Sequence, residues 1–245
     1  MDLPAPDAEF FDKILVPWAT PLMQYHRYSL IGAERLPRTG PVLLISTHSM
    51  ITYDLFFAFI ELRRQTGRFV RSLADDFWFR TRTVGKTFER CGLVRASPQA
   101  GRVLLEQGEL LGVSPGGQWE ALRPSTERHR LRWEGRRGFS RLALMTRVPL
   151  ALVTCPAADR VMTVYSSPLT DWVYRRFGSP LPLVRGLGPT LIPRPIRLTT
   201  YVSPVFYPPN ITSQSPTDIQ IEQFREEVQT RMEAFMAEAL HHDGA

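Results

Sequence analysis

Short apolar runs alternate with amphipathic stretches along most of the chain. The run Val42–Ser46 (Val-Leu-Leu-Ile-Ser) is apolar and rich in branched side chains, which is typical of a strand buried on both faces. Because such runs alternate with stretches of helical periodicity, the pattern predicts an α/β fold with a largely parallel central sheet and flanking helices. The other predicted strands cover residues 69–73, 110–113, 150–154, 161–165 and 196–206, and the helices between them cover residues 52–64, 77–90, 98–107 and 136–147.

Both ends of the sequence show helical patterns of their own. Between residues 7 and 28, Phe10, Phe11, Ile14, Leu15, Trp18 and Leu22 recur at helical spacing, with Asp7 placed to cap the helix. This amphipathic helix either packs on its own domain or lies in a membrane interface. Apolar residues between Phe224 and Ala239 predict a C-terminal helix over residues 217–240. We therefore expect an N-terminal helical segment, residues 1–33, and an α/β domain, residues 34–245.

Composition favours an ordinary globular protein without a transmembrane segment. Hydrophobic residues make up 43% and charged residues 22% of the 245 positions. No apolar run reaches 18 residues, and the first dozen residues are acidic rather than basic, unlike a secretory signal. The two cysteines, Cys91 and Cys155, are far apart and form no metal-binding pair. We expect a cytoplasmic protein, peripheral on the inner face of the cell membrane if the N-terminal helix binds lipid, without metal or cofactor.

The positive charge is concentrated in one segment. The chain carries 30 basic and 24 acidic residues, a net charge of +6, and only two of the basic residues are lysines. Residues 123–147 hold eight arginines against two glutamates, which accounts for the whole surplus. Either this segment binds an anionic partner, such as a phosphorylated molecule, an acidic carrier protein or a lipid headgroup, or it is a solvated arginine face. No nucleic-acid-binding motif accompanies it, so we do not expect nucleic acid as a partner.

The strongest candidate for chemistry follows the first predicted strand. His48 and Asp54 flank a short segment at the carboxyl end of Val42–Ser46, where open α/β sheets place their ligands. An imidazole can take a proton from a hydroxyl near neutral pH, and a carboxylate on its far nitrogen would fix its tautomer. Residues six apart do not share a helix face, so the pair must bracket a loop, with Thr52 as the helix cap.

A second candidate follows the strand at residues 110–113. Gly112 to Gly116 match the G-x-S-x-G pattern of a serine hydrolase around Ser114. That elbow requires the residue after the serine to donate its backbone N–H, and Pro115 has none. The pattern therefore favours a turn whose Gly116 and Gly117 N–H groups bind an oxyanion or an acceptor oxygen, or else a purely structural turn.

Several segments in the same order resemble the glycerolipid acyltransferase superfamily, which includes glycerol-phosphate and lysophosphatidate acyltransferases. The resemblance covers residues 35–209 and is closest to the diacylglycerol acyltransferase type-2-like and monoacylglycerol acyltransferase branch. It rests on Glu34–Ile45 leading into His48, on Ser114–Leu122 as a P-G-G-x-x-E-A block, on Trp133–Phe139 as an N-R-K-G-F block, and on Arg147–Leu150 as a V-P-hydrophobic block.

The resemblance implies acyl transfer from an acyl thioester, acyl-CoA or acyl carrier protein, to a hydroxyl acceptor. In it, His48 is the general base and Asp54 its orienting carboxylate, without a covalent acyl-enzyme. It places Gly116, Gly117 and Glu120 at the oxyanion or the acceptor. Donor phosphates would contact arginines of the matched basic segments, namely Arg136, Arg137 and Arg95, since guanidinium groups suit phosphate oxygens.

Departures from the family pattern guide the choice of acceptor. Five residues separate His48 from Asp54 where four are usual, and Thr47 stands where the family often has Asn. The E-G-T-R block of the lysophosphatidate enzymes is replaced by Pro115–Gly117, which favours an uncharged lipid alcohol such as mono- or diacylglycerol. Lysophosphatidate or glycerol-phosphate acylation, and a non-catalytic anion- or lipid-binding module, remain alternatives.

Overall fold

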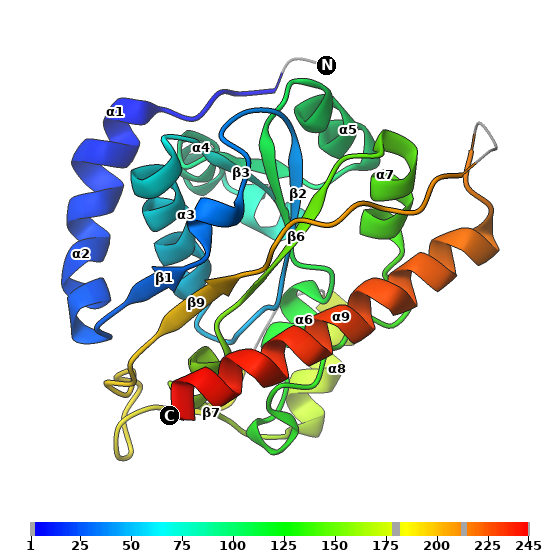
Figure 1. Ribbon diagram of the computed structural model, residues 1–245. Helices are drawn as coiled ribbons and strands as arrows, with labels where there is room; N and C mark the ends of the chain where they lie inside the picture. The colour runs from blue at the N-terminus through cyan, green and yellow to red at the C-terminus, as the bar shows by residue number, and fades with distance from the viewer. Residues whose placement is uncertain (1–2, 178–181, 212–214, 245) are drawn as a thin grey trace.

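The computed structural model describes residues 3–177, 182–211 and 215–244, and a seven-stranded sheet forms its centre (Figure 1). The strand order is β1-β9-β6-β2-β5-β3-β4, and neighbouring strands are parallel except for the antiparallel pair β6–β9. The strands are β1 (Ser29–Ile31), β2 (Val42–Ser46), β3 (Val70–Ala74), β4 (Leu93–Arg95), β5 (Leu110–Val113), β6 (Leu150–Thr154) and β9 (Thr199–Val202). The predicted α/β fold with a largely parallel sheet is confirmed.

Helices cover both faces of this sheet (Figure 1). Leu43 and Ile45 of β2 belong to one apolar cluster with α5, α7 and α9, whereas Val42 and Leu44 belong to another with α3. Alternate residues of β2 therefore face opposite helical layers, which explains its unbroken apolar run. The helices are α1 (Ala8–Phe10), α2 (Val16–Tyr25), α3 (Tyr53–Thr66), α4 (Arg82–Arg90), α5 (Pro98–Glu106), α6 (Gly117–Ala121), α7 (Gly138–Thr146), α8 (Pro168–Phe177) and α9 (Asp218–Gly244).

The N-terminal helix packs on the domain with one face and leaves the other exposed. Asp7 caps α1 by accepting the Phe10 N–H at 2.9 Å, as the sequence predicts, and a π turn over residues 11–15 connects α1 to α2. Phe11 is buried against α3, whereas Ile14 and Trp18 are 55% and 77% exposed. The segment 1–33 also supplies β1, which pairs with β9 in the central sheet.

Two predicted strands and one predicted helix differ from the structure. Only Thr163–Val164 of residues 161–165 is a strand, β7, and it pairs with β8 (Val184–Arg185) outside the central sheet. Val161 is apolar because it packs in the cluster beneath α2. Within residues 196–206, only β9 is a strand. The predicted helix 77–90 is a 3₁₀ turn, Asp76–Phe79, followed by α4.

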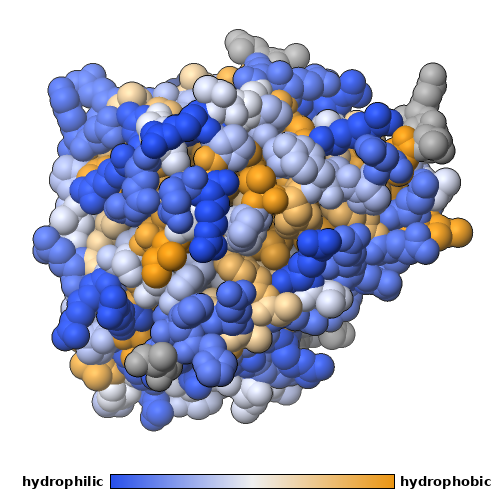
Figure 2. All heavy atoms as spheres, in the orientation of Figure 1, coloured by the Kyte–Doolittle hydropathy of each residue, from blue (hydrophilic) through white to orange (hydrophobic). Residues whose placement is uncertain are grey.

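The face of the molecule viewed in Figure 1 is mainly hydrophilic. Figure 2 shows hydrophilic side chains around a smaller apolar area near the middle of the face viewed in Figure 1. Among the described helices, none has both the length and the apolar character required to cross a bilayer.

Candidate active site

The loops after β2, β3 and β5 meet at one edge of the sheet. These strands are parallel neighbours, with Ile45 opposite Val113 and Ser72 opposite Gly112, so their carboxyl ends lie side by side. His48 follows β2 and Gly117 follows β5. This edge is where an open parallel sheet binds its ligands.

Two adjoining cavities open at this edge. The first, the His48 cavity, has a volume of about 330 Å³ and is lined largely by apolar and aromatic side chains, including Phe56, Phe59 and Trp78. The second, the Arg136 cavity, has a volume of about 370 Å³ and runs between the ends of β5, α5 and α7. Five residues line both cavities, namely Leu73, Asp75, Ser114, Gly117 and Gln118. The two cavities can therefore accommodate one long ligand with an apolar end and a polar end.

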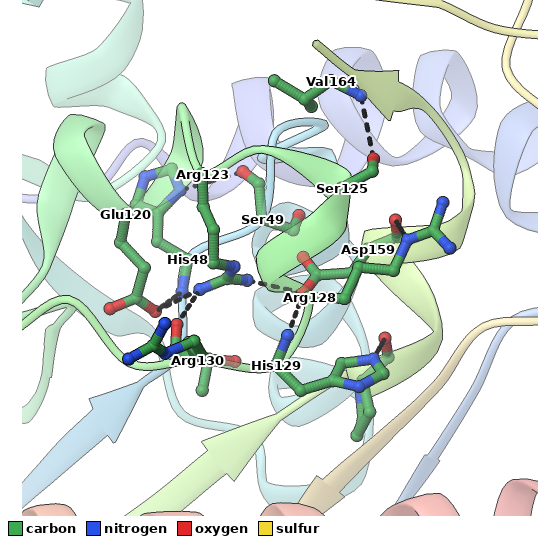
Figure 3. A network of polar contacts seen from close by, with 12 residues as sticks. His48, Ser49, Glu120, Arg123, Ser125, Arg128, His129, Arg130, Asp159 and Val164 are labelled. Carbon is green, nitrogen blue, oxygen red and sulfur yellow. Dashed lines mark hydrogen bonds and ion pairs between the residues drawn. The ribbon is translucent and has the colours of Figure 1, made fainter. Parts of the chain in front are cut away.

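His48 presents one ring nitrogen as a proton acceptor. Its Nδ1 lies 3.0 Å from the carbonyl oxygen of Ser49 (Figure 3), and a carbonyl only accepts hydrogen bonds, so Nδ1 carries the proton. Nε2 is then left unprotonated. Burial lowers the pKa of His48 below its ordinary value of 6.5, although the hydrogen bond to the Ser49 carbonyl opposes that shift. The positive charge of Arg123 acts in the same direction as burial. The imidazole is therefore neutral at pH 7 and suited to act as a base.

Asp54 supports His48 through Ser49 rather than by direct contact. Its carboxylate accepts the Ser49 hydroxyl at 2.9 Å, and no hydrogen bond joins it to the His48 ring among the described residues. The prediction that Asp54 directly orients the imidazole is thus corrected, because the Ser49 carbonyl occupies Nδ1. Burial raises the pKa of Asp54 to about 6, although the Ser49 hydroxyl opposes that shift. Thr52 occupies the N-cap position of α3, but its side chain makes no capping hydrogen bond, which corrects the predicted cap. Its φ of 55° is unusual for a β-branched residue and marks a constrained loop.

Glu120 holds the His48 loop in place and lines neither cavity. Its buried carboxylate accepts the backbone N–H groups of His48 at 2.9 Å and Arg132 at 3.2 Å. Arg123 lies 3.8 Å from this carboxylate and binds Asp159 at 2.5 Å (Figure 3). Burial raises the pKa of Glu120, while the His48 N–H and the Arg123 charge oppose that shift. The predicted contact of Glu120 with the acceptor is therefore corrected to a positioning role.

The two glycines have different structural tasks. A Cβ on Gly116 would overlap the Glu120 carboxylate, so the absence of a side chain lets that carboxylate approach the backbone. Gly117 has a φ of +52°, and its N–H donates to the Ser114 carbonyl at 3.0 Å. The predicted oxyanion contact from the Gly117 N–H is corrected, because that donor is already occupied in the turn. Gly116 is buried and does not line either cavity.

Ser114 has no arrangement for nucleophilic catalysis. Its hydroxyl bonds the Ser46 hydroxyl at 2.7 Å, and no histidine is hydrogen-bonded to it among the described residues. Together with Pro115, which lacks a backbone donor, this geometry agrees with the sequence argument against a serine hydrolase.

The three arginines predicted to bind donor phosphates are not equivalent. Arg136 lines the Arg136 cavity, and its guanidinium has no ion pair or hydrogen bond with any described residue. Arg137 is paired with Glu222 of α9 at 2.8 Å, and Arg95 with Asp76. Only Arg136 is both unpaired and placed in a cavity.

Most other arginines of residues 123–147 bind within the protein rather than forming an open basic surface. Arg132 pairs with Glu127 at 3.0 Å and lies over the Trp119 ring, while Arg141 pairs with Asp218 at 3.2 Å. Backbone carbonyl oxygens accept from the Arg128 and Arg147 side chains. Most of these arginines therefore bind other parts of the protein, whereas the sequence analysis expected either an anion-binding segment or a solvated arginine face.

His26 has hydrogen-bond partners that give it a structural role. His26 is fully buried, with Nδ1 at 2.9 Å from the Ile196 carbonyl and Nε2 at 2.7 Å from the Tyr53 hydroxyl. In the described part of the chain, no group of histidine, cysteine, aspartate and glutamate residues could hold a metal ion.

Comparison with known proteins agrees with this arrangement. The family model described as "Acyltransferase" matches residues 27–156, which contain β1 to β6 and the His48, Glu120 and Arg136 segments. The chain belongs to the acyltransferase family. Its match includes every strand whose carboxyl end borders the two cavities, so the family region contains most of the candidate site.

This acyltransferase-family chain is similar to proteins named for the synthesis of storage lipids. It is 30% identical over 193 residues to the human "DGAT1/2-independent enzyme synthesizing storage lipids", covering 78% of this chain and 57% of that protein. The bovine protein of the same name is 29% identical over 193 residues, covering 78% of this chain and 55% of the relative. The chain thus spans little more than half the length of these relatives.

The fold is also similar to a solved acyltransferase structure. The 1-acyl-sn-glycerophosphate acyltransferase PlsC from Thermotoga maritima superposes with a TM-score of 0.54 at 13% identity, covering 89% of this chain and 77% of that one. This similarity supports the α/β architecture.

Sequence reasoning missed three residues of the site. Ser49 orients the imidazole through its backbone oxygen, which no sequence pattern encodes. Arg123 was recognised only as part of a basic segment, although it is buried between two carboxylates. Gln118 occupies a variable position of the P-G-G-x-x-E-A block, and its place within that block is the only signal of it in the sequence.

Proposed function

We propose that the protein transfers a fatty acyl group from an acyl thioester, acyl-CoA or acyl carrier protein, to an uncharged lipid alcohol such as mono- or diacylglycerol. One observation carries this proposal: a neutral imidazole with a fixed tautomer borders an apolar cavity that adjoins a cavity with an unpaired arginine. Family membership and the names of the relatives support the same chemistry.

The geometry supports the following reaction. Nε2 of His48 removes the proton of the acceptor hydroxyl, and the oxygen attacks the thioester carbonyl carbon. The resulting tetrahedral oxyanion collapses with cleavage of the carbon–sulfur bond, and the leaving thiolate takes the proton from His48. No covalent acyl-enzyme is required, because both substrates meet in the adjoining cavities.

The lining of the His48 cavity favours an uncharged acceptor. None of the described residues that line it is a lysine or an arginine. A phosphorylated acceptor would therefore lose hydration there without gaining a cation. Arg136, in the second cavity, is available instead for the phosphates of the donor.

We further propose that the protein works at the inner face of the cell membrane as a peripheral protein. The exposed side of the N-terminal helical segment presents Ile14 of the π turn and Trp18 of α2, and Trp18 also lines the His48 cavity. A lipid acceptor could thus pass from the bilayer into the cavity along this helix.

The deciding experiment measures thiol release with a panel of donors and acceptors. We expect turnover with acyl-CoA or acyl carrier protein and monoacylglycerol or diacylglycerol, and a loss of at least 100-fold in His48→Ala. His129→Ala, which changes a histidine outside both cavities, should retain activity. Faster turnover with lysophosphatidate than with monoacylglycerol or diacylglycerol would refute the proposal of an uncharged acceptor. Vesicle binding without thiol release from any donor would indicate a non-catalytic binding module.

A further inference from the structure

The carboxamide of Gln118 is a buried polar group without a partner. Both Nε2 and Oε1 are shielded from solvent, and none of the described residues hydrogen-bonds either atom. An amide has two donor hydrogens and one acceptor oxygen, and leaving all of them unpaired in the interior is unfavourable. Buried polar groups without a hydrogen-bond partner are rare in folded proteins, which makes this side chain a candidate for a functional role.

Gln118 stands where the two cavities meet. It lines both the His48 cavity and the Arg136 cavity. An acyl thioester that places its chain in the apolar cavity and its phosphates near Arg136 must bring its carbonyl group past this junction. Gln118 already forms part of the wall of both cavities, so rotation of its side chain would point the carboxamide into the cavity at this junction.

Several other donors near the junction already have acceptors. The Gly117 N–H is bonded to the Ser114 carbonyl, and Pro115 has no N–H. The His48 N–H is held by Glu120, and the Ser114 hydroxyl is paired with that of Ser46. The negative oxygen of a tetrahedral intermediate requires donors aimed at it. Among the groups considered, only Gln118 has unpaired donor hydrogens.

We propose that Gln118 is a catalytic residue that stabilises the oxyanion formed from the thioester donor. This inference rests on the proposed acyl transfer. As the acceptor oxygen bonds to the carbonyl carbon, the carbonyl electron pair moves to the oxygen, and Nε2–H of Gln118 donates a hydrogen bond to it. When the carbon–sulfur bond breaks, the carbonyl forms again and the hydrogen bond weakens.

The test replaces Gln118 with methionine, which has a similar length but no donor. We expect Gln118→Met to lower kcat by about 100- to 1000-fold while the KM values for donor and acceptor change by less than about threefold. Its thermal midpoint should equal or exceed that of the wild type, because an unpaired buried amide has been removed. Gln118→Glu, with oxygen in place of the donor nitrogen, should lose kcat to at least the same extent.

Controls separate this role from a structural one. Gln223→Met, on the exposed side of α9, should leave kcat and the thermal midpoint unchanged. Unchanged kcat in Gln118→Met, a rise in donor KM alone, or a loss of kcat with a lower thermal midpoint would each overturn the assignment. A wild type without thiol release from any donor would refute the proposed function itself, whereas an active wild type matched by Gln118→Met would refute only this inference.

Discussion

The buried carboxylate of Glu120 offers a sharp test of how the His48 loop is held. Glu120→Gln preserves the size of the side chain, but one of its two acceptor oxygens becomes an NH₂ group. That group would face the N–H of either His48 or Arg132, so one buried donor would lose its partner. Leaving a buried donor unpaired costs about 1–3 kcal/mol.

The substitution also removes a charge beside Arg123. The two side chains are almost completely buried and 3.8 Å apart, although Arg123 retains Asp159 at 2.5 Å. Because the second carboxylate remains, we expect a total loss of about 2–4 kcal/mol in the free energy of unfolding. For a chain of this size, that corresponds to a fall of roughly 10 °C in thermal midpoint.

Urea unfolding and steady-state kinetics on the same preparations test this prediction. A looser His48 loop should lower kcat by about 10- to 100-fold, with little change in the acceptor KM. Glu233→Gln, on the exposed side of α9, should shift the stability by less than about 0.5 kcal/mol. Unchanged stability in Glu120→Gln, combined with a raised acceptor KM, would refute the positioning role and restore a direct contact with the acceptor.

Other features of the site give further predictions. Gly116→Ala should displace the carboxylate of Glu120, lowering stability by about 1–3 kcal/mol in urea unfolding and kcat at least tenfold; wild-type values would contradict the close approach. Asp54 has a pKa of about 6 in the folded protein against 3.8 ordinarily, so its contribution to stability falls as pH rises from about 4 to 6. Between pH 4 and pH 7, the free energy of unfolding of Asp54→Asn should therefore rise by on the order of 3 kcal/mol relative to that of the wild type. A difference between the two proteins that does not change with pH would disprove this. Arg136→Ala should raise the KM for acyl-CoA but not for a short acyl thioester without phosphates, and equal effects on both would count against a phosphate contact. Trp18→Ala should weaken sedimentation with liposomes while leaving the thermal midpoint unchanged, and undiminished sedimentation would argue against this face as the membrane contact.

The sequence predicts the centre of the sheet better than its edges. The ranges of β2, β5 and β6 agree with the predicted runs because central parallel strands are apolar on both faces. β1 and β4 have only three residues each, too few for a periodic pattern, and were not among the predicted strands. Their pairing depends on neighbours that only the folded chain supplies.

The candidate site was predicted through its motifs, but not the partners of each residue. His48 was found because a histidine and an aspartate follow a buried strand. The partner of Glu120 is a backbone N–H 72 positions away, and Arg137 pairs with Glu222 in the last helix. Such contacts depend on how distant segments pack, and a local sequence pattern contains no information about them.

The position of β9 constrains the order in which this chain can fold during synthesis. β9 lies between β1 and β6, so β1 joins the sheet through a strand about 170 residues later in the chain. While the ribosome makes the intervening residues, the exposed edge of β6 and the unpaired β1 are available for incorrect pairing. Contacts of such long sequence separation form slowly, and we therefore expect the edge near β1 to become protected late in refolding.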